Sequence, residues 1–398
     1  MKLASSIIIL SIFSVFLISC TNNESKEKSQ DETIKINLDK AQTLKVSDHF
    51  KLKDVIYFSD SLVVDNLMKV STHNDYVVLH CGWGLDYLVI KNTLTAKEFI
   101  ISAKGEGSNQ YQKLNNFFIN KKGQIELLDG QSGKILTYNM EGELLSVYQN
   151  EKLQQVTSLL SIDGEHYFLF GGNFYAGKSG YQMQIWNKNE GKVKSSYIPF
   201  DEQKAGFMLF IEPRNFSKNP SSFYQVYNQY VYELGEDAVK DSLYLDFGQD
   251  NIPAELFENS YQDVREFSQD MAKSGYAYGL GNFLLEENLL FASVRKNEQN
   301  FHFYTNTKTG ESTVFDKISN DVFGLKTDEK IGYQYRPVAM DGNDIYFIVS
   351  LEAQNENFGK TLVTNSSKSE LNQRLLSKIE NFKDGDNLAI VKCEITGF

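Results

Sequence analysis

Short runs in which apolar and polar residues alternate fill most of the chain from residue 44 onward, and turns rich in Gly, Asn and Asp separate them. Alternation with a period of two is the pattern of a half-buried β-strand. The clearest unit covers residues 114–148, where four such runs (LNNFFI, QIELL, KILTYN and ELLSVY) are joined by short turns. Four antiparallel strands in about 35 residues correspond to one blade of a β-propeller.

The same pattern returns along the chain, so that six units can be counted. Besides the unit just described, they cover residues 66–101, 153–200, 206–247, 276–315 and 333–396. Units of similar size favour radial repetition, and we predict an all-β fold, a six-bladed β-propeller over residues 44–398. A β-sandwich is the alternative architecture. Residues 44–58 hold one strand in excess, which we expect to complete the sixth blade and remove an exposed sheet edge.

Two segments depart from the strand pattern and predict short helical insertions. Residues 252–273 follow Asp250, a suitable capping residue, and contain few β-forming runs. Residues 367–382 place apolar side chains one helical turn apart, as in Leu371 and Leu375. Both segments are expected to interrupt the propeller without forming a separate domain.

The N-terminus has the features of an export signal. Residues 3–17 form an apolar stretch that is shorter than the about 20 residues of a membrane-spanning helix. It ends in Leu-Ile-Ser-Cys at 17–20, which resembles the lipobox of bacterial lipoproteins. We predict a signal peptide over residues 1–19 and lipid attachment at Cys20. An ordinary signal peptide with a chance cysteine is the alternative.

Residues 20–43 are interpreted as the lipid-bearing cysteine and a flexible tether, because 21–33 contains no apolar residue. Several acyl chains on one cysteine exceed the single-chain threshold for stable anchoring. No later segment approaches the length of a membrane span. We therefore expect a lipid-anchored protein of the cell envelope, in the outer membrane and facing either the periplasm or the cell surface.

Three stretches resemble the six-bladed β-propeller lipoproteins of Bacteroidetes, a family of unknown function related to NHL-repeat propellers. Residues 104–111 (KGEGSNQY) are similar to the family's G-x-G-P-G-E-Y segment, with Ser108 in place of Pro and Gln110 in place of Glu. Residues 244–253 resemble its D-F-G…I-P pattern, and 387–392 resemble its last strand. The resemblance implies the propeller fold and an envelope location, and it carries over no catalytic residues.

Composition and charge limit the fold class and the kinds of partner that this chain can bind. Aromatic residues make up 13% of the chain and proline is rare, which favours β structure. The formal net charge is -12 and no basic stripe is present, which excludes nucleic acid as a partner. If Cys20 is acylated, Cys81 and Cys393 remain, and either a disulfide or two buried thiols is consistent with the sequence.

Motifs for catalysis or for cofactor binding are missing from the sequence. The five histidines show no compact metal-ligand spacing, and no nucleophile elbow, Walker loop or dinucleotide fingerprint occurs. We predict no cofactor, no metal site and no catalytic residues.

The sequence favours ligand binding over catalysis. The loops at 82–87, 105–111 and 171–181 are rich in glycine and aromatic residues, which suit sugars or peptides. Two arginines beside prolines are expected to point into the channel. The predicted ligand-binding residues are Trp83, Tyr111, Arg214 and Arg336. The alternatives are aromatic packing between blades and surface ion pairs.

The sequence therefore predicts a non-catalytic binding or scaffolding module for a glycan, a peptide or an envelope protein. The alternative is an envelope hydrolase or lyase with a site at the mouth of the propeller channel. Titratable residues that converge at that mouth would distinguish the two functions.

Overall fold

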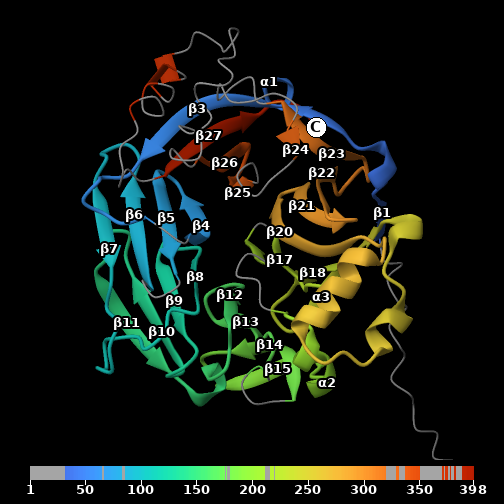
Figure 1. Ribbon diagram of the computed structural model, residues 1–398. Coiled ribbons are helices and arrows are strands. Elements are labelled where there is room, and N and C mark those ends of the chain that lie inside the picture. Colours follow the sequence, from blue (N-terminus) through green and yellow to red (C-terminus); the bar gives the residue numbers. More distant parts are fainter. Residues whose placement is uncertain are drawn as a thin grey trace, which may run out of the picture.

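The computed structural model describes residues 32–64, 67–82, 86–174, 176, 180–210, 216–218, 220–319, 329–330, 337–349, 370–371, 373–374, 377, 381 and 388–398. Within these residues the strands form six separate sheets, arranged as a ring about a common centre (Figure 1). The predicted six-bladed β-propeller is confirmed.

Each of the first three blades is a four-stranded antiparallel sheet whose strands follow one another from the centre outward. Blade 1 contains β4 (Leu67–His73), β5 (Tyr76–Cys81), β6 (Tyr87–Asn92) and β7 (Glu98–Ile101). Blade 2 contains β8 (Asn116–Ile119), β9 (Ile125–Asp129), β10 (Lys134–Tyr138) and β11 (Leu144–Gln149). Blade 3 contains β12 (Ser158–Ser161), β13 (His166–Phe170), β14 (Tyr181–Asn187) and β15 (Lys192–Pro199).

The remaining blades follow the same plan with additions at their outer edges. Blade 4 contains β16 (Phe216–Lys218), β17 (Ser221–Tyr224), β18 (Tyr230–Leu234) and β19 (Val239–Asp246). Blade 5 contains β20 (Tyr278–Glu286), β21 (Leu289–Lys296), β22 (Gln299–Asn306) and β23 (Ser312–Ser319), with β24 (Glu329–Lys330) paired to β23. Blade 6 contains β25 (Pro337–Asp341), β26 (Asp344–Val349) and β27 (Ala389–Ile395) from the C-terminal part of the chain.

The fourth strand of blade 6 comes from the N-terminal part of the chain. β3 (Phe50–Tyr57) pairs antiparallel with β27 and covers its outer edge. The ring is closed further by His49, whose Nδ1 lies 2.6 Å from the carbonyl oxygen of Gly397. The strand predicted at 44–58 therefore has the predicted role.

Two shorter strands precede β3 and extend the folded unit beyond the predicted boundary. β1 (Glu32–Lys35) pairs parallel with β19, and β2 (Gln42–Lys45) pairs parallel with β23. η1 (Leu38–Lys40) separates these two strands, and α1 (Val46–His49) leads from β2 into β3.

This arrangement differs from the predicted tether over residues 20–43, because the propeller includes Glu32 and the residues after it. Ile34, Ile36 and Leu38 occupy alternate positions and are buried against blades 4 and 5, which is the period-two signal of a strand. Residues 1–31, with Cys20 and the predicted signal peptide, lie outside the described residues.

The first predicted helical insertion is present as two shorter pieces, η5 (Ala254–Glu258) and α3 (Val264–Lys273), after η4 (Gly248–Asp250). Asp263 caps α3 by accepting the backbone N–H groups of Arg265 and Glu266, both at 2.9 Å. α3 buries Phe267 and Met271 beside Phe207 of α2 (Glu202–Phe207). A further short helix, η2 (Glu151–Leu153), follows β11. Most of the second predicted insertion, 367–382, lies outside the described residues.

The connections divide the propeller into two faces. The loop face carries the connections between blades and the loops that join the second and third strands of each blade. The hairpin face carries the turns between the first and second strands and between the third and fourth strands. All three loops predicted for recognition, at 82–87, 105–111 and 171–181, belong to the loop face.

Apolar side chains from neighbouring blades form the core between the sheets. Cys81 packs between blades 6 and 1, and Cys393 packs between blades 5 and 6. No disulfide joins these two buried residues. Of the two readings of the sequence, buried thiols are therefore correct.

Candidate functional site

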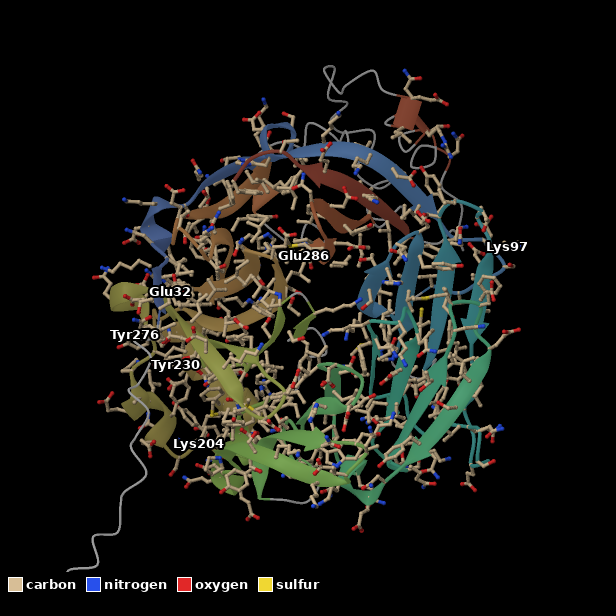
Figure 2. The ribbon with its side chains drawn as sticks, turned by 180° about the vertical axis from the view of Figure 1, so that it is seen from behind. Glu32, Lys97, Lys204, Tyr230, Tyr276 and Glu286 are labelled. Atoms are coloured by element: carbon tan, nitrogen blue, oxygen red, sulfur yellow. The ribbon has the colours of Figure 1, made fainter. Side chains whose placement is uncertain are left out.

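The inner strands of all six blades surround a cavity of about 370 Å³ in the central channel. β4, β8, β12, β16, β20 and β25 each contribute to its wall. Figure 2 shows Glu286, at the end of β20, beside the centre of the ring. Because residues at the hairpin ends of these strands line the cavity, it opens toward the hairpin face.

Lys69 extends from β4 toward the inner strand of blade 2. Its Nζ donates to Oδ1 of Asn116 at 2.9 Å and to the carbonyl oxygen of Phe117 at 2.7 Å. The ammonium also lies 5.3 Å from the centre of the Phe117 ring. Burial lowers the pKa of Lys69 to about 7, because a charged amine is poorly solvated there.

Five further titratable groups from five different blades line this cavity. They are His73 on blade 1, Lys121 on blade 2, Lys218 on blade 4, Glu286 on blade 5 and Asp341 on blade 6. Burial lowers the pKa of Lys218, while the carboxylates of Asp341 and Glu286 oppose that shift. Burial and the charge of Lys218 lower the pKa of His73, and Asp341 opposes them.

A second cavity, of about 600 Å³, lies on the loop face over blades 1 to 3. Its lining combines uncharged polar side chains, the charged residues Asp86 and Lys113, and one exposed aromatic ring. Asn115, Gln131, Gln155 and Thr157 are among its polar residues. Phe174, which lies in one of the loops predicted for recognition, also lines the cavity and is 49% exposed.

His80 forms the most buried polar part of this lining, with only 3% of its surface exposed. Neither ring nitrogen has a hydrogen-bond partner among the described residues. Burial lowers the pKa of His80 to about 4, with a smaller contribution from Lys69, while Asp86 opposes the shift. The imidazole is therefore neutral near pH 7 and offers one donor and one acceptor.

Tyr111 is the one predicted ligand-binding residue that lies among the described residues. Trp83, Arg214 and Arg336 lie outside the described residues, so their roles remain predictions. Tyr111 is fully buried between blades 1 and 2, and its hydroxyl donates to the carbonyl oxygen of Asp86. This placement gives Tyr111 the packing role that was the alternative for aromatic residues in these loops.

Two residues that sequence reasoning did not select, Lys69 and His80, occupy the walls of the cavities. They are cross-strand neighbours in blade 1. His80 is one of the five histidines that were considered only as metal ligands, and Lys69 carried no sequence signal. Both side chains are buried by contacts with β8 of blade 2, which lies far from them in the sequence.

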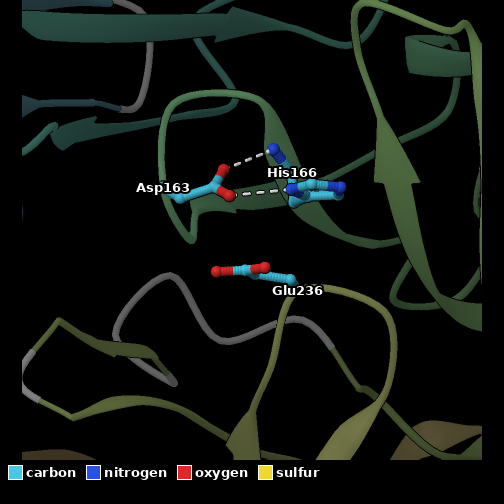
Figure 3. Close-up of side chains that lie close together, drawn as sticks. All are labelled: Asp163, His166 and Glu236. Carbon is cyan, nitrogen blue, oxygen red and sulfur yellow. Dashed lines mark hydrogen bonds and ion pairs between the residues drawn. The ribbon is translucent and has the colours of Figure 1, made fainter.

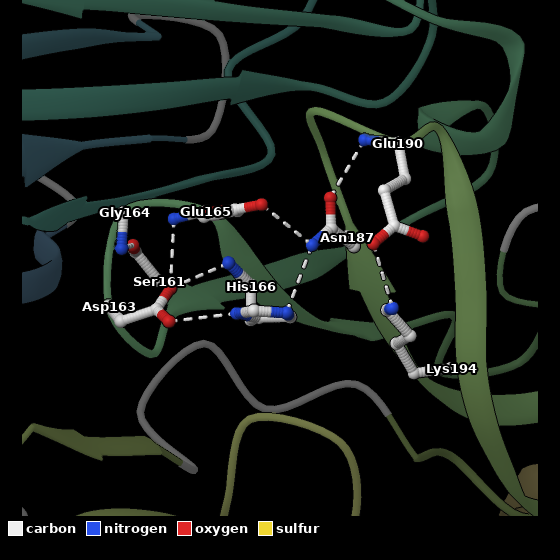
Figure 4. A network of polar contacts seen from close by, with 8 residues as sticks. All are labelled: Ser161, Asp163, Gly164, Glu165, His166, Asn187, Glu190 and Lys194. Atoms are coloured by element: carbon white, nitrogen blue, oxygen red, sulfur yellow. Dashed lines mark hydrogen bonds and ion pairs between the residues drawn. The ribbon is translucent and has the colours of Figure 1, made fainter.

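One cluster outside the cavities has the composition of a metal site. Asp163, His166 and Glu236 place three ligand-type atoms within 4.8 Å of one another, at the hairpin ends of blades 3 and 4 (Figure 3). His166 Nδ1 lies 2.8 Å from Oδ2 of Asp163, and its Nε2 lies 3.0 Å from Nδ2 of Asn187 (Figure 4). A metal would have to displace the Nδ1 hydrogen bond, so the contacts describe a hydrogen-bonded turn before β13.

The arrangement defines the class of the protein: a six-bladed β-propeller with a charged central cavity and a polar cavity on its loop face. The chain belongs to the family described as Domain of unknown function (DUF4934), whose sequence profile matches residues 99–394. This membership confirms the predicted resemblance to a propeller family of unknown function. No curated protein matches the sequence.

Three solved structures are similar to this chain at low sequence identity, and one of them has a TM-score above 0.5. A protein of Bacteroides fragilis, named as a candidate exported protein, superposes with a TM-score of 0.72 at 14% identity and covers 92% of this chain and 100% of its own. A member of the DUF4221 family from Bacteroides vulgatus gives 0.46 at 11% identity, covering 88% and 99%. Virginiamycin B lyase from Staphylococcus aureus gives 0.40 at 14% identity, covering 75% and 81%. Identities this low show the fold alone.

No helix among the described residues has the length and apolar character that a membrane crossing requires.

Proposed function

We propose that this protein is a lipid-anchored protein of the cell envelope whose propeller binds a glycan in the loop-face cavity, without catalysis. The observation that carries the proposal is the buried imidazole of His80, which lines that cavity with both nitrogens unpartnered among the described residues. A buried polar group without a partner costs about 1–3 kcal/mol. A ligand hydroxyl that donates to the acceptor nitrogen or accepts from the ring N–H would recover part of that loss.

Apart from Asp86 and Lys113, the rest of the lining is uncharged and suits a glycan. Amide and hydroxyl groups from Asn115, Gln131 and Thr157 suit sugar hydroxyls, since each can donate or accept. Phe174 offers an exposed ring of the kind that packs against the apolar face of a sugar. Asp86 forms an ion pair with Lys104, with 2.7 Å between Oδ2 and Nζ. The lysine charge therefore offsets the negative charge that Asp86 would present to a ligand. A peptide is the other ligand class that this lining admits.

One observation supports the second candidate function, an envelope hydrolase or lyase. Titratable groups converge at the mouth of the central channel, where Glu286 and Asp341 lie near Lys218. Substitution of Asp341 by Asn would abolish turnover of an envelope substrate if this candidate were correct. Unchanged capture of ligand by the same variant would favour the binding module.

The anchoring part of the proposal predicts a change in location. Replacing Cys20 by Ala removes the acyl acceptor, so the protein should leave the membrane fraction and appear in the soluble fraction. Detergent partitioning and mass spectrometry of the mature N-terminus measure this directly. A wild-type chain that is unmodified and soluble after export would contradict the proposed anchor.

The binding part predicts opposite effects of one substitution on binding and stability. His80→Phe removes both unpartnered nitrogens while keeping an aromatic ring in the core, so the variant should fold with equal or higher stability. It should nevertheless lose at least tenfold in affinity for captured glycans, equivalent to about 1.4 kcal/mol. Binding of envelope glycans to the purified Cys20→Ala protein, with thermal unfolding alongside, provides both measurements.

A matched pair of surface variants controls for general effects. Phe174→Ala removes the exposed ring of the cavity, whereas Leu145→Ala removes a side chain that is also 49% exposed but lies on β11, at the outer edge of blade 2. We expect weaker binding only for Phe174→Ala. Full glycan binding by both His80→Phe and Phe174→Ala would show that the ligand does not occupy this cavity. If the protein captured peptides and no glycan, the ligand class would be a peptide instead of a glycan.

A further inference from the structure

The central cavity contains a lysine whose charge is not balanced by an acid. Lys69 Nζ donates to one side-chain oxygen and one backbone carbonyl, both neutral acceptors. It forms no ion pair with a carboxylate of the described residues, and burial is the sole cause of its lowered pKa. An ammonium has three donors, so one N–H remains for a further acceptor.

The carboxylates that line the cavity interact electrostatically with groups other than Lys69. Glu286 and Asp341 act on Lys218, and Asp341 also acts on His73. On its own blade Lys69 faces His80, which is neutral near pH 7 and cannot supply a negative charge.

The cavity itself has an excess of positive groups. Lys69, Lys121 and Lys218 line it from blades 1, 2 and 4, against the two carboxylates of Glu286 and Asp341. This excess is unusual in a chain whose formal net charge is -12. The hydroxyl groups of Ser71 and Thr72 are also part of the lining and add hydrogen-bond donors, whereas the hydroxyl of Ser217 donates to the carbonyl oxygen of Leu285.

We propose that the channel cavity is a binding site for a small oxyanion, with Lys69 as its direct ligand-binding residue. The ligands that would fit share a compact group of negatively charged oxygens, as in a carboxylate or a sulfate. Such a group would accept the remaining N–H of Lys69 and the hydroxyl groups beside it. This site is separate from the loop-face cavity and does not depend on the proposed glycan binding.

The proposal has a consequence for the effect of pH. The amine must be protonated to hold an anion, and the pKa of Lys69 without ligand is about 7. Raising the pH above this value therefore adds the cost of protonating the amine to every binding event. Affinity should be nearly constant below pH 6 and should fall by roughly fiftyfold between pH 7 and pH 9. Acetate, succinate and sulfate all keep their charges between pH 7 and pH 9, so the change over that range would belong to the protein.

The experiment is calorimetric titration of the full mature chain with sodium acetate, sodium succinate and sodium sulfate at pH 6, 7.5 and 9. The chloride salt serves as the ionic-strength control. Lys69→Met should abolish binding, and it should still fold because an apolar chain of similar length replaces a buried amine. Lys69→Arg should bind at all three pH values with little change, since a guanidinium stays charged.

Two further variants separate a local effect from a change in overall charge. Lys122→Met removes the same charge on the same face from an exposed residue that does not line the cavity, and it should bind like the wild type. Asp341→Asn removes a negative charge from the mouth and should tighten binding several-fold. Isotope-labelled lysine would report the pKa of Lys69 directly by NMR, and saturating anion should raise it.

Binding of acetate or succinate without sulfate would identify an organic acid as the ligand class, and binding of sulfate alone would identify an inorganic oxyanion. Absence of binding to all three anions at pH 6, in both the wild type and Lys69→Arg, would overturn the proposal. Equal binding by wild type and Lys69→Met would overturn it as well, because the anion would then be held elsewhere.

Discussion

A chain shortened to begin at residue 58 is expected to be insoluble, or to unfold far below the temperature of the intact protein. The truncation removes β3, which covers the outer edge of β27 and buries Phe50, Val55 and Ile56. Full burial of such side chains stabilises a fold by about 1.5–3 kcal/mol each. Their combined loss is comparable with the about 5–15 kcal/mol that separates most folded proteins from the unfolded state. Soluble yield, size-exclusion chromatography and thermal unfolding measure the effect.

Two further start points resolve the contributions within this N-terminal part. A chain that begins at residue 32 keeps every described strand and should match the mature protein. A chain that begins at residue 50 keeps β3 but loses β1 and β2, with Ile34 and Leu44, so its stability should be intermediate. A monomeric chain from residue 58 with an unchanged melting temperature would show that β3 does not close the ring.

Glu126→Leu is expected to lower the free energy of unfolding by about 2–5 kcal/mol, because it breaks a buried hydrogen-bond network between blades 2 and 3. The Glu126 carboxylate is 4% exposed. It accepts the hydroxyl of Tyr167 at 2.9 Å and Nδ2 of Asn120 at 2.8 Å. Burial and the charge of Glu126 raise the pKa of Tyr167 above its usual range, so this hydroxyl remains a donor. Leucine would remove the carboxylate acceptor of the Tyr167 hydroxyl and one of the two acceptors of Asn120 Nδ2, which also donates to Oε1 of Gln124 at 3.2 Å.

A double-mutant cycle assigns this loss to the contact itself. Tyr167→Phe removes one donor, so the further cost of Glu126→Leu in that background should fall by about 1–3 kcal/mol. Chemical denaturation of the four proteins provides the values. Additive effects would mean that the two side chains do not stabilise each other, and that the destabilisation comes from a change in packing.

The blade pattern could be predicted closely where turns frame each strand. In blade 2 the four runs predicted within residues 114–148 correspond to β8, β9, β10 and β11. The turns explain this agreement: Gly123, Gly133 and Gly142 all adopt positive φ angles, which glycine adopts readily. β1 and β2 were missed because they are four residues long and lie beside strands that are distant in sequence.

The candidate sites could be predicted only as far as their face of the propeller. Phe174, which lies in the loop at 171–181 predicted for recognition, lines the loop-face cavity, and the binding role of that loop stays a prediction. The roles of Lys69 and His80 could not be predicted, because their properties depend on burial by other elements. Lys69 has neutral partners on β8, in the next blade, and His80 lies 6.3 Å from Phe117, measured between ring centres. No local spacing in the sequence reports such contacts.

The contact between the two ends of the chain also determines when the ring can be completed during folding. His49 and Gly397 are 348 positions apart, and β3 has its partner only once β27 has been synthesised. Contacts between such distant positions form slowly, because closing a long loop costs conformational entropy. Native closure must therefore follow synthesis of nearly the whole chain, and a nascent chain that stops before residue 389 leaves β3 as an unpaired edge.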